Sequence, residues 1–329
     1  MKLVKFFIFV SIFVFIVGIS TVAAEQTKVF QIGHVCSTSP TDPYQVICMS
    51  FAKNVEEMSK NSIKIEVFPN ALLGGEREML ESMQIGTIDM ALVGNVAVAS
   101  FLPKWMIFDL PFLFSSSKQA YEVLDGPLGN EILNTLEEIG IKGLAWGEGG
   151  FRHMINNVRP IREPKDLKGL KFRSVENPVY IDTYKALGSN PTPMAWAETF
   201  TGMQQGTIDG LDIPIAVIYA NHFYEIAKYI SLTGHFYNAL VLTVSEIVWN
   251  QLTPEEQNIL LQSAKKAGND EREFIQLNEQ KFIDEMQSKG VKVNDINKKL
   301  FREKVTPVYD KYRDKIGADI LDRLFKIIK

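Results

Sequence analysis

The sequence predicts an α/β protein built as two lobes, and three observations support this. Segments with the patterns of strands and helices alternate from Val29 onward, which is typical of a largely parallel sheet covered by helices. The heptamer MQIGTID at residues 83–89 returns as MQQGTID at residues 203–209. Without residues 1–24, which have the composition of a leader, 329 − 24 = 305 residues remain, a length that suits two domains better than one.

Residues 1–24 resemble a secretory signal peptide. Lys2 and Lys5 precede an apolar stretch from Phe6 to Val17, and small residues follow as far as Ala24. This is the order of parts found in signal peptides. The alternative is a membrane anchor, but a spanning helix needs about 20 apolar residues, more than this stretch provides. We therefore expect cleavage after Ala24 and export of the mature chain.

Charge and cysteine content narrow the classes of function. Loss of the two leader lysines changes the formal charge from −4 to −6, and a mildly acidic protein is a poor candidate for binding nucleic acid. An anionic ligand would therefore need local cations. Cys36 and Cys48 allow a single disulfide, which export would permit, or they are two unpaired apolar side chains; both alternatives stay open. Two cysteines without a clustered pair of histidines disfavour a structural zinc site.

The elements of the first part of the chain can be predicted in order. The first helix, at 44–60, is introduced by Thr41, Asp42 and Pro43, which form a start signal. In the second strand apolar and polar residues alternate, and the strand ends at Pro69. Gly86 ends the second helix before a buried strand. The predicted elements are a strand at 28–35, a helix at 44–60, a strand at 63–69, a helix at 76–84 and a strand at 87–93.

The heptamer repeat indicates two lobes of related architecture. In both copies a glutamate, Glu78 or Glu198, stands five residues before the methionine. A glycine between helix and strand tolerates a positive φ and so ends the helix. Upstream, residues 63–70 show a looser similarity to residues 170–177. The same helix–Gly–strand context in both copies favours two related lobes over coincidence.

The C-terminal part of the chain is predicted to be helical. Thr253 and Pro254 have the pattern of a helix cap and first turn, and the chain to Gln287 is rich in Glu, Lys, Gln and Ala. One or two long amphipathic helices are expected there, and residues 297–328 repeat the pattern. Such helices could brace both lobes, with their charged residues on solvated faces.

No catalytic motif is evident. The four histidines are not spaced to share a helix face, and the sequence has no GxSxG, no HExxH and no phosphate-binding Gly-Lys-Ser/Thr loop. We therefore expect no enzyme, no metal site and no cofactor. The rival interpretation is an exported α/β hydrolase or lyase that uses Glu76 and His34 as acid and base; a turnover assay would distinguish it.

Two arginines are the clearest candidates for ligand binding. Arg152 follows the glycine-rich segment Gly147 to Gly150, and Arg173 ends the otherwise apolar strand LKGLKFR. In open α/β sheets, ligands lie beyond the carboxyl ends of the strands. A guanidinium presents a planar fork of donors that matches a carboxylate. The alternative for each arginine is a surface ion pair, but an inward arginine on an apolar strand needs an anion.

These segments together resemble a known family. The region from GGFRHMINN (149–157) through MQQGTIDGLDIP (203–214), with LLGGEREMLESMQIGTIDM, IFDLPFLF and LTGHFYN, is similar to solute-binding proteins of tripartite ATP-independent periplasmic (TRAP) transporters, of the dicarboxylate-binding-protein type. The resemblance covers essentially the whole mature chain. It implies a two-lobe periplasmic binding protein fold, with a cleft between the lobes, long spanning and C-terminal helices, and no catalytic activity.

The resemblance also implies roles for individual residues. Arg173 matches the arginine that holds the ligand carboxylate in most members, and Arg152 matches a second arginine of the site. Many members have Asn where this chain has Ile213. Sialic-acid-binding members carry Glu and Arg where we align Gly94 and Ala97, so sialic acid is not expected. The predicted ligand-binding set is Arg173, Arg152, Glu76, Trp196, Asp212, Asn95 and His34.

The function implied is capture of a small carboxylate-bearing molecule in the periplasm and its delivery to the membrane permease by a monomeric protein that closes around it. A sensor subunit that reports the ligand to a receptor is the alternative within the binding class. We expect a hydroxylated monocarboxylate before a C4-dicarboxylate, because Asp212 and Glu76 would repel a second carboxylate and Arg77 is the nearest further cation. The expected lobes are residues 25–149 with about 239–278, and residues 150–238 with about 279–329.

Overall fold

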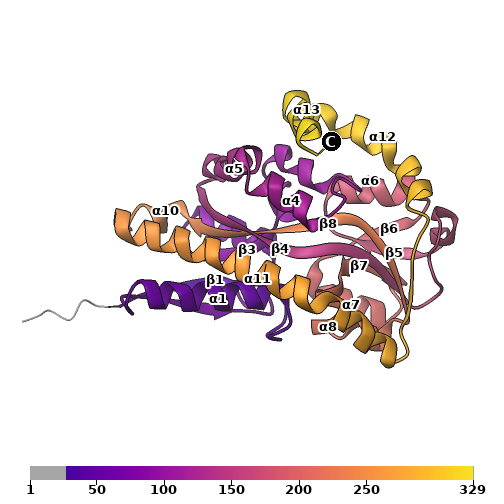
Figure 1. Cartoon of the computed structure of the whole chain (residues 1–329), viewed down its shortest axis with the longest axis horizontal. Helices are drawn as coiled ribbons and strands as arrows, with labels where there is room; N and C mark the ends of the chain where they lie inside the picture. Colours follow the sequence, from indigo (N-terminus) through magenta and orange to yellow (C-terminus); the bar gives the residue numbers. More distant parts are fainter. Residues whose placement is uncertain (1–26, 329) are drawn as a thin grey trace, which may run out of the picture.

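The computed structural model describes residues 27–328 as an α/β molecule of two lobes that share one sheet (Figure 1). The predicted signal peptide, residues 1–24, lies outside the described residues. Among the helices described, none combines the length and the apolar composition needed to cross a bilayer.

Within residues 27–328, nine strands form the sheet, in the order β2-β1-β3-β8-β4-β7-β5-β6, with β9 pairing beside β8. The strands are β1 (Lys28–Gly33), β2 (Ile63–Phe68), β3 (Met90–Gly94), β4 (Ile141–Asn156), β5 (Lys171–Ser174), β6 (Asn190–Pro193), β7 (Gly210–Pro214), β8 (Tyr229–Ser245) and β9 (Lys292–Asn294).

The sheet consists of two parallel groups joined by two long antiparallel strands. In one group β1 pairs in parallel with β2 and β3, and in the other β5 pairs in parallel with β6 and β7. β4 and β8 run antiparallel to each other from Ile141↔Ser245 to Asn156↔Tyr229. β8 also pairs with β3, and β4 also pairs with β7. The predicted parallel sheet is therefore present within each group, and the two strands that join the groups run from one lobe into the other.

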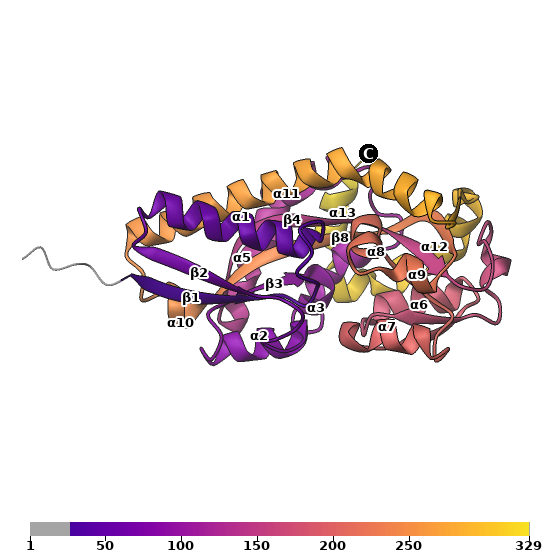
Figure 2. The same ribbon diagram turned by 90° about the horizontal axis from the view of Figure 1, so that it is seen from below.

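Helices cover both faces of this sheet (Figures 1 and 2). The α-helices are α1 (Pro43–Met58), α2 (Glu76–Gln84), α3 (Asn95–Val98), α4 (Ser117–Leu124), α5 (Pro127–Asn134), α6 (Pro178–Ala186), α7 (Trp196–Gln204), α8 (Ile215–Ala220), α9 (Phe223–Ile226), α10 (Glu246–Trp249), α11 (Pro254–Ser288), α12 (Lys298–Ile316) and α13 (Ala318–Ile327). Three 3₁₀ helices are η1 (Pro103–Asp109), η2 (Thr135–Ile139) and η3 (Pro164–Leu167).

The heptamer repeat corresponds to one structural unit that occurs in each lobe. Gly86 and Gly206 follow α2 and α7 with φ of 74° and 73°, as expected for a left-handed residue that ends a helix. Asp89 and Asp209 then accept hydrogen bonds of 2.8 Å from the backbone N–H of Gln31 on β1 and of Lys171 on β5. The alignment of residues 63–70 with 170–177 is wrong. In the sheet order β2-β1-β3 and β7-β5-β6, the edge strand β2 corresponds to the edge strand β6 and not to β5.

The predicted helix starts are confirmed. Asp42 caps α1 by accepting from the N–H of Tyr44 at 3.0 Å. Thr253 caps α11, and the Glu256 side chain returns to the Thr253 N–H at 2.8 Å, which is a capping box. α11 is a single helix of 35 residues, and Figure 2 shows that it runs along both lobes.

α11 lies close against the strand β4 where the lobes meet. A Cβ at Gly268 of α11 would stand 2.4 Å from the Trp146 carbonyl oxygen, so only glycine permits this approach. Of the two C-terminal helices, α13 also connects the lobes. Tyr312 of α12 donates to Asp182 of α6 at 2.5 Å, whereas Arg323 of α13 pairs with Glu131 of α5.

The structure resolves the question left open for the two cysteines. Cys36 and Cys48 are both buried and unpaired. Burial raises the pKa of each thiol well above its usual value. Because the thiolate is the reactive form, the two side chains act here as small apolar residues of the core.

Candidate functional site

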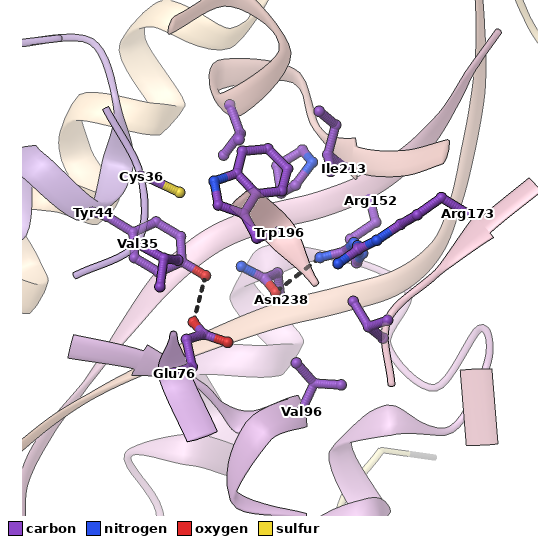
Figure 3. A pocket seen from close by; sticks show the side chains of 13 residues that line it. Val35, Cys36, Tyr44, Glu76, Val96, Arg152, Arg173, Trp196, Ile213 and Asn238 are labelled. Carbon is purple, nitrogen blue, oxygen red and sulfur yellow. Dashed lines mark hydrogen bonds between the residues drawn. The ribbon is translucent and has the colours of Figure 1, made fainter. Parts of the chain in front are cut away.

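Two connected chambers lie between the lobes. The inner chamber has a volume of about 50 Å³, and the adjoining outer cavity has a volume of about 530 Å³. Six residues line both chambers: Val35, Glu76, Val96, Arg173, Val175 and Trp196. Figure 3 shows the inner chamber, with Glu76 and Tyr44 on one side and the two arginines on the other.

The sheet topology explains why these residues meet. Val35 and Val175 follow the ends of β1 and β5, and Glu76 and Trp196 are the first residues of α2 and α7. Glu76 and Trp196 stand at the same distance from their copies of the heptamer, seven residues before Met83 and Met203. The repeat therefore places equivalent positions opposite each other, at the carboxyl ends of the parallel strands where ligands bind in such sheets.

Arg152 lies on the crossing strand β4, and its guanidinium donates hydrogen bonds to Asp212 and Asn238. Its Nε donates to Asp212 Oδ2 and its Nη2 to the Asp212 carbonyl oxygen, each at 2.5 Å, and its Nη1 donates to Asn238 Oδ1 at 3.2 Å. Burial alone would lower the pKa of Arg152, but the charge of Asp212 outweighs burial and holds it above the usual value. Three of its five N–H groups are used, which leaves two for another acceptor.

Arg173 is buried without a carboxylate partner. It lies near the end of β5, is 4% exposed, and donates from Nε to the Met194 carbonyl oxygen at 3.0 Å. None of the ion pairs formed within residues 27–328 includes Arg173. Burial and repulsion by Arg152 lower the pKa of Arg173 to about 10. A buried cation that lacks a partner is costly, and a carboxylate in the chamber would remove that cost.

Glu76 is the acidic residue that lines both chambers, and Glu78, Glu176 and Glu198 also line the outer one. Its Oε1 accepts from the Gly94 N–H at 2.8 Å and from the Tyr44 hydroxyl at 3.4 Å. Burial raises the pKa of Glu76 in spite of these two donors and of the nearby arginines. No hydrogen bond to its Oε2 comes from the described residues, so this oxygen can accept from a ligand.

Trp196 adds an aromatic surface to both chambers. It is half-buried and packs against Phe223 with ring centroids 5.6 Å apart. The rest of its indole lies along the cavity, as Figure 3 shows. Four members of the predicted ligand-binding set, namely Arg152, Arg173, Glu76 and Trp196, therefore line the same chamber.

The other three members of the predicted set lie behind the wall. Asp212 is fully buried, its Oδ2 accepts from Arg152, and it is not among the residues that line either chamber, so it is not placed to accept from ligand hydroxyls. Asn95 donates to Asp109 at 2.7 Å, away from the chamber. His34 is fully buried beside Gln45, with Nε2 and Oε1 2.8 Å apart, and burial lowers its pKa to about 4. That environment keeps His34 neutral and does not suit an acid–base pair with Glu76.

Asn238 and Tyr44 are wall residues that the sequence analysis did not select. Asn238 comes from the crossing strand β8 and Tyr44 from the first turn of α1. Asn238 belongs to the LTGHFYN stretch that carried part of the family resemblance. That stretch was the available signal, although it does not show which of its side chains faces the cavity.

Comparisons with known proteins point to one family. The family model for bacterial extracellular solute-binding proteins of family 7 matches residues 32–315. The 2,3-diketo-L-gulonate-binding periplasmic protein YiaO of Escherichia coli K12 is 35% identical over 311 residues, which cover 93% of this chain and 95% of that protein.

Solved structures of TRAP periplasmic solute-binding proteins have the same fold. The protein from Polaromonas sp. JS666, bound to D-erythronate, is 38% identical with a TM-score of 0.86, over 90% of this chain and 98% of that chain. The protein from Sulfurospirillum deleyianum, with bound succinate, is 27% identical with a TM-score of 0.86, over 92% of this chain and 99% of that chain. Proteins of this fold thus hold both a sugar acid and a dicarboxylate.

Proposed function

Because the chain belongs to family 7 of the bacterial extracellular solute-binding proteins, we propose that it captures a small organic acid in the periplasm and delivers it to the membrane subunits of a TRAP transporter. One observation carries the proposal: Arg173 is a buried guanidinium on the wall of a cavity between two lobes, and no carboxylate of residues 27–328 pairs with it. Like its relatives, it is a solute-binding protein and not an enzyme.

The carboxylate is held by two arginines with different roles. Arg173 provides the uncompensated charge and its free Nη donors, which match two carboxylate oxygens. Arg152 is neutralised by Asp212 and contributes directed N–H groups more than charge. The pair therefore favours a ligand with a single negative charge at this end.

Closure of the lobes completes the site. We propose lobes of residues 25–149 with about 239–278, and residues 150–238 with about 279–329, joined by β4, β8 and α11. α13 bridges back to the first lobe through Arg323 and Glu131. Bending at the crossing strands would bring Glu76 and Trp196 together over the ligand. Exclusion of water would then strengthen each charged contact.

The ligand is a hydroxylated monocarboxylate rather than a C4-dicarboxylate. The sequence argument for this order used both Asp212 and Glu76, and only Glu76 still supports it. Arg77, the further cation that a dicarboxylate would need, lines the outer cavity, but it pairs with Glu81 at 3.0 Å and its side chain is 69% exposed. Glu76 accepts hydrogen bonds from hydroxyl groups and repels a second carboxylate.

A thermal-shift screen of organic acids tests the proposal. A ligand that binds only the native state raises the free energy of unfolding by mass action, by about 2.7 kcal/mol at a hundredfold excess over Kd. The melting temperature rises with it. D-Erythronate, D-galacturonate and succinate are suitable probes, and the two sugar acids should stabilise the protein more than succinate does. Stabilisation by succinate alone would reverse the order, and no shift with any organic acid would contradict the proposed function.

Two variants identify the cause of this preference. Glu76→Gln keeps an oxygen to accept from the Gly94 N–H and removes the charge, so succinate binding should improve roughly tenfold, the effect of one relieved charge contact of about 1.4 kcal/mol. Arg77→Ala, on the same helix, removes a cation that lines the outer cavity and should leave the succinate response unchanged, because Arg77 is exposed and paired with Glu81. If Arg77→Ala instead abolished succinate binding, Arg77 would be the second cation of a dicarboxylate site.

A further inference from the structure

Asn238 is a buried amide that faces the inner chamber. It lies on β8, is 2% exposed, and is the amide side chain that lines the inner chamber among the described residues. Most of the remaining wall is apolar, with Val35, Val96, Val175 and Ile213 around it. A neutral donor in such a wall can form a hydrogen bond with one polar group of a ligand and so select for it.

The orientation of this amide is fixed by Arg152. A guanidinium only donates, and Arg152 Nη1 donates to Asn238 Oδ1 at 3.2 Å. The oxygen must therefore face Arg152, which turns the nitrogen toward the Tyr44 side of the chamber, as Figure 3 shows. The nitrogen carries two hydrogens, so one stays available to the cavity even where the other meets the Tyr44 hydroxyl.

Gly149 gives the amide its space. A Cβ at Gly149 on the neighbouring strand β4 would stand 2.0 Å from Asn238 Nδ2. Gly149 is not among the glycines with positive φ, so its backbone does not demand glycine. The absence of a side chain at residue 149 therefore serves the placement of the Asn238 amide.

We propose that Asn238 reads an oxygen on the carbon next to the ligand carboxylate, so that the site selects 2-hydroxy or 2-oxo acids. The inference rests on the proposed function, because it takes the carboxylate to lie on Arg173 and Arg152. Asn238 touches Arg152 directly, so its free N–H lies beside that carboxylate. A hydroxyl or carbonyl oxygen accepts this hydrogen bond, and a CH₂ group at the same place leaves the N–H buried without a partner.

Calorimetry with matched ligand pairs tests this role. The pairs are D-erythronate with 3,4-dihydroxybutanoate, D-gluconate with 2-deoxy-D-gluconate, and lactate with propionate. The wild-type protein should prefer the oxygenated member of the best-binding pair by roughly tenfold or more, since a site built to bond a hydroxyl rejects the analogue that lacks it. In Asn238→Ala this ratio should fall to within about twofold.

A second variant makes the test independent of the asparagine itself. Gly149→Ala displaces the amide without removing it and should reduce the same ratio. Asn130→Ala is the control. Asn130, in α5, donates to the backbone oxygens of Asp125 and Gly126 and lines neither chamber, so the ratio should keep its wild-type value.

The outcomes separate this inference from the proposed function. If Asn238→Ala weakens both members of a pair equally, Asn238 only supports Arg152 and the inference is wrong. If succinate or the deoxy acids bind and none of the oxygenated acids does, the inference is again wrong while the proposed function stands. If no organic acid binds the wild-type protein, both fail.

Discussion

Replacing Arg173 by alanine is expected to abolish organic-acid binding while the fold stays intact. Loss of one partner of a desolvated charged contact costs about 2–5 kcal/mol, a fall in affinity of roughly 30-fold to several thousandfold. Arg173→Lys should also bind weakly, because an ammonium cannot reproduce the two-pronged contact. Isothermal titration calorimetry measures the affinity, and circular dichroism establishes that each variant is folded.

The same substitution is expected to affect stability in the opposite direction: Arg173→Ala weakens ligand binding but should not destabilise the ligand-free protein. Arg173 has no carboxylate partner within residues 27–328, and its pKa is lowered by burial and by Arg152, so its charge destabilises the empty protein. Arg173→Ala should therefore melt at the same temperature as the wild type or higher. A folded Arg173→Ala protein that binds organic acids with wild-type affinity would contradict the role assigned to Arg173.

Replacing Asp212 by alanine is expected to lower the free energy of unfolding by about 3–5 kcal/mol, because removal of one partner leaves a buried charge uncompensated. Arg152 would then face Arg173 with neither cation neutralised. The double variant Arg152→Met with Asp212→Leu removes both charges and should recover most of that loss. Urea denaturation followed by circular dichroism measures each value.

The effect should also depend on pH in a defined direction. Burial favours the neutral form of Asp212, but the charge of Arg152 outweighs it, so the pKa of Asp212 is lowered in the folded state. Its contribution is therefore complete above the unfolded pKa, about 3.9, and is lost as pH falls through the lower folded pKa. The difference between wild type and Asp212→Ala should narrow only in strong acid. Equal stability of the two proteins at pH 7 would show that the pair is not structurally important.

Local patterns in the sequence predicted the elements and the repeat. Helix starts at Asp42 and Thr253 depend on side chains within three residues, and the glycines at 86 and 206 mark helix ends by their own conformation. These interactions are local, so the sequence alone is enough to identify them. The same holds for the alternation that predicted a largely parallel sheet covered by helices.

The parts that could not be predicted depend on distant pairings. Arg152 and Asp212 are 60 positions apart, and their contact requires β4 and β7 to be neighbours in the sheet. The sequence analysis therefore counted Asp212 as a ligand contact when it is the partner of an arginine. Asn238 was missed for the same reason: the side of the long strand β8 that faces the chamber depends on the register shifts along its pairing with β4.

The most direct test of the central claim is a crystal structure of the protein with bound D-erythronate. We expect the carboxylate oxygens at about 2.7–2.9 Å from the Nη atoms of Arg173, the usual range for charge-assisted contacts, with the ligand lying between Glu76 and Trp196. A bound ligand whose carboxylate lies away from Arg173, or whose hydroxyl groups face the two arginines, would contradict the account.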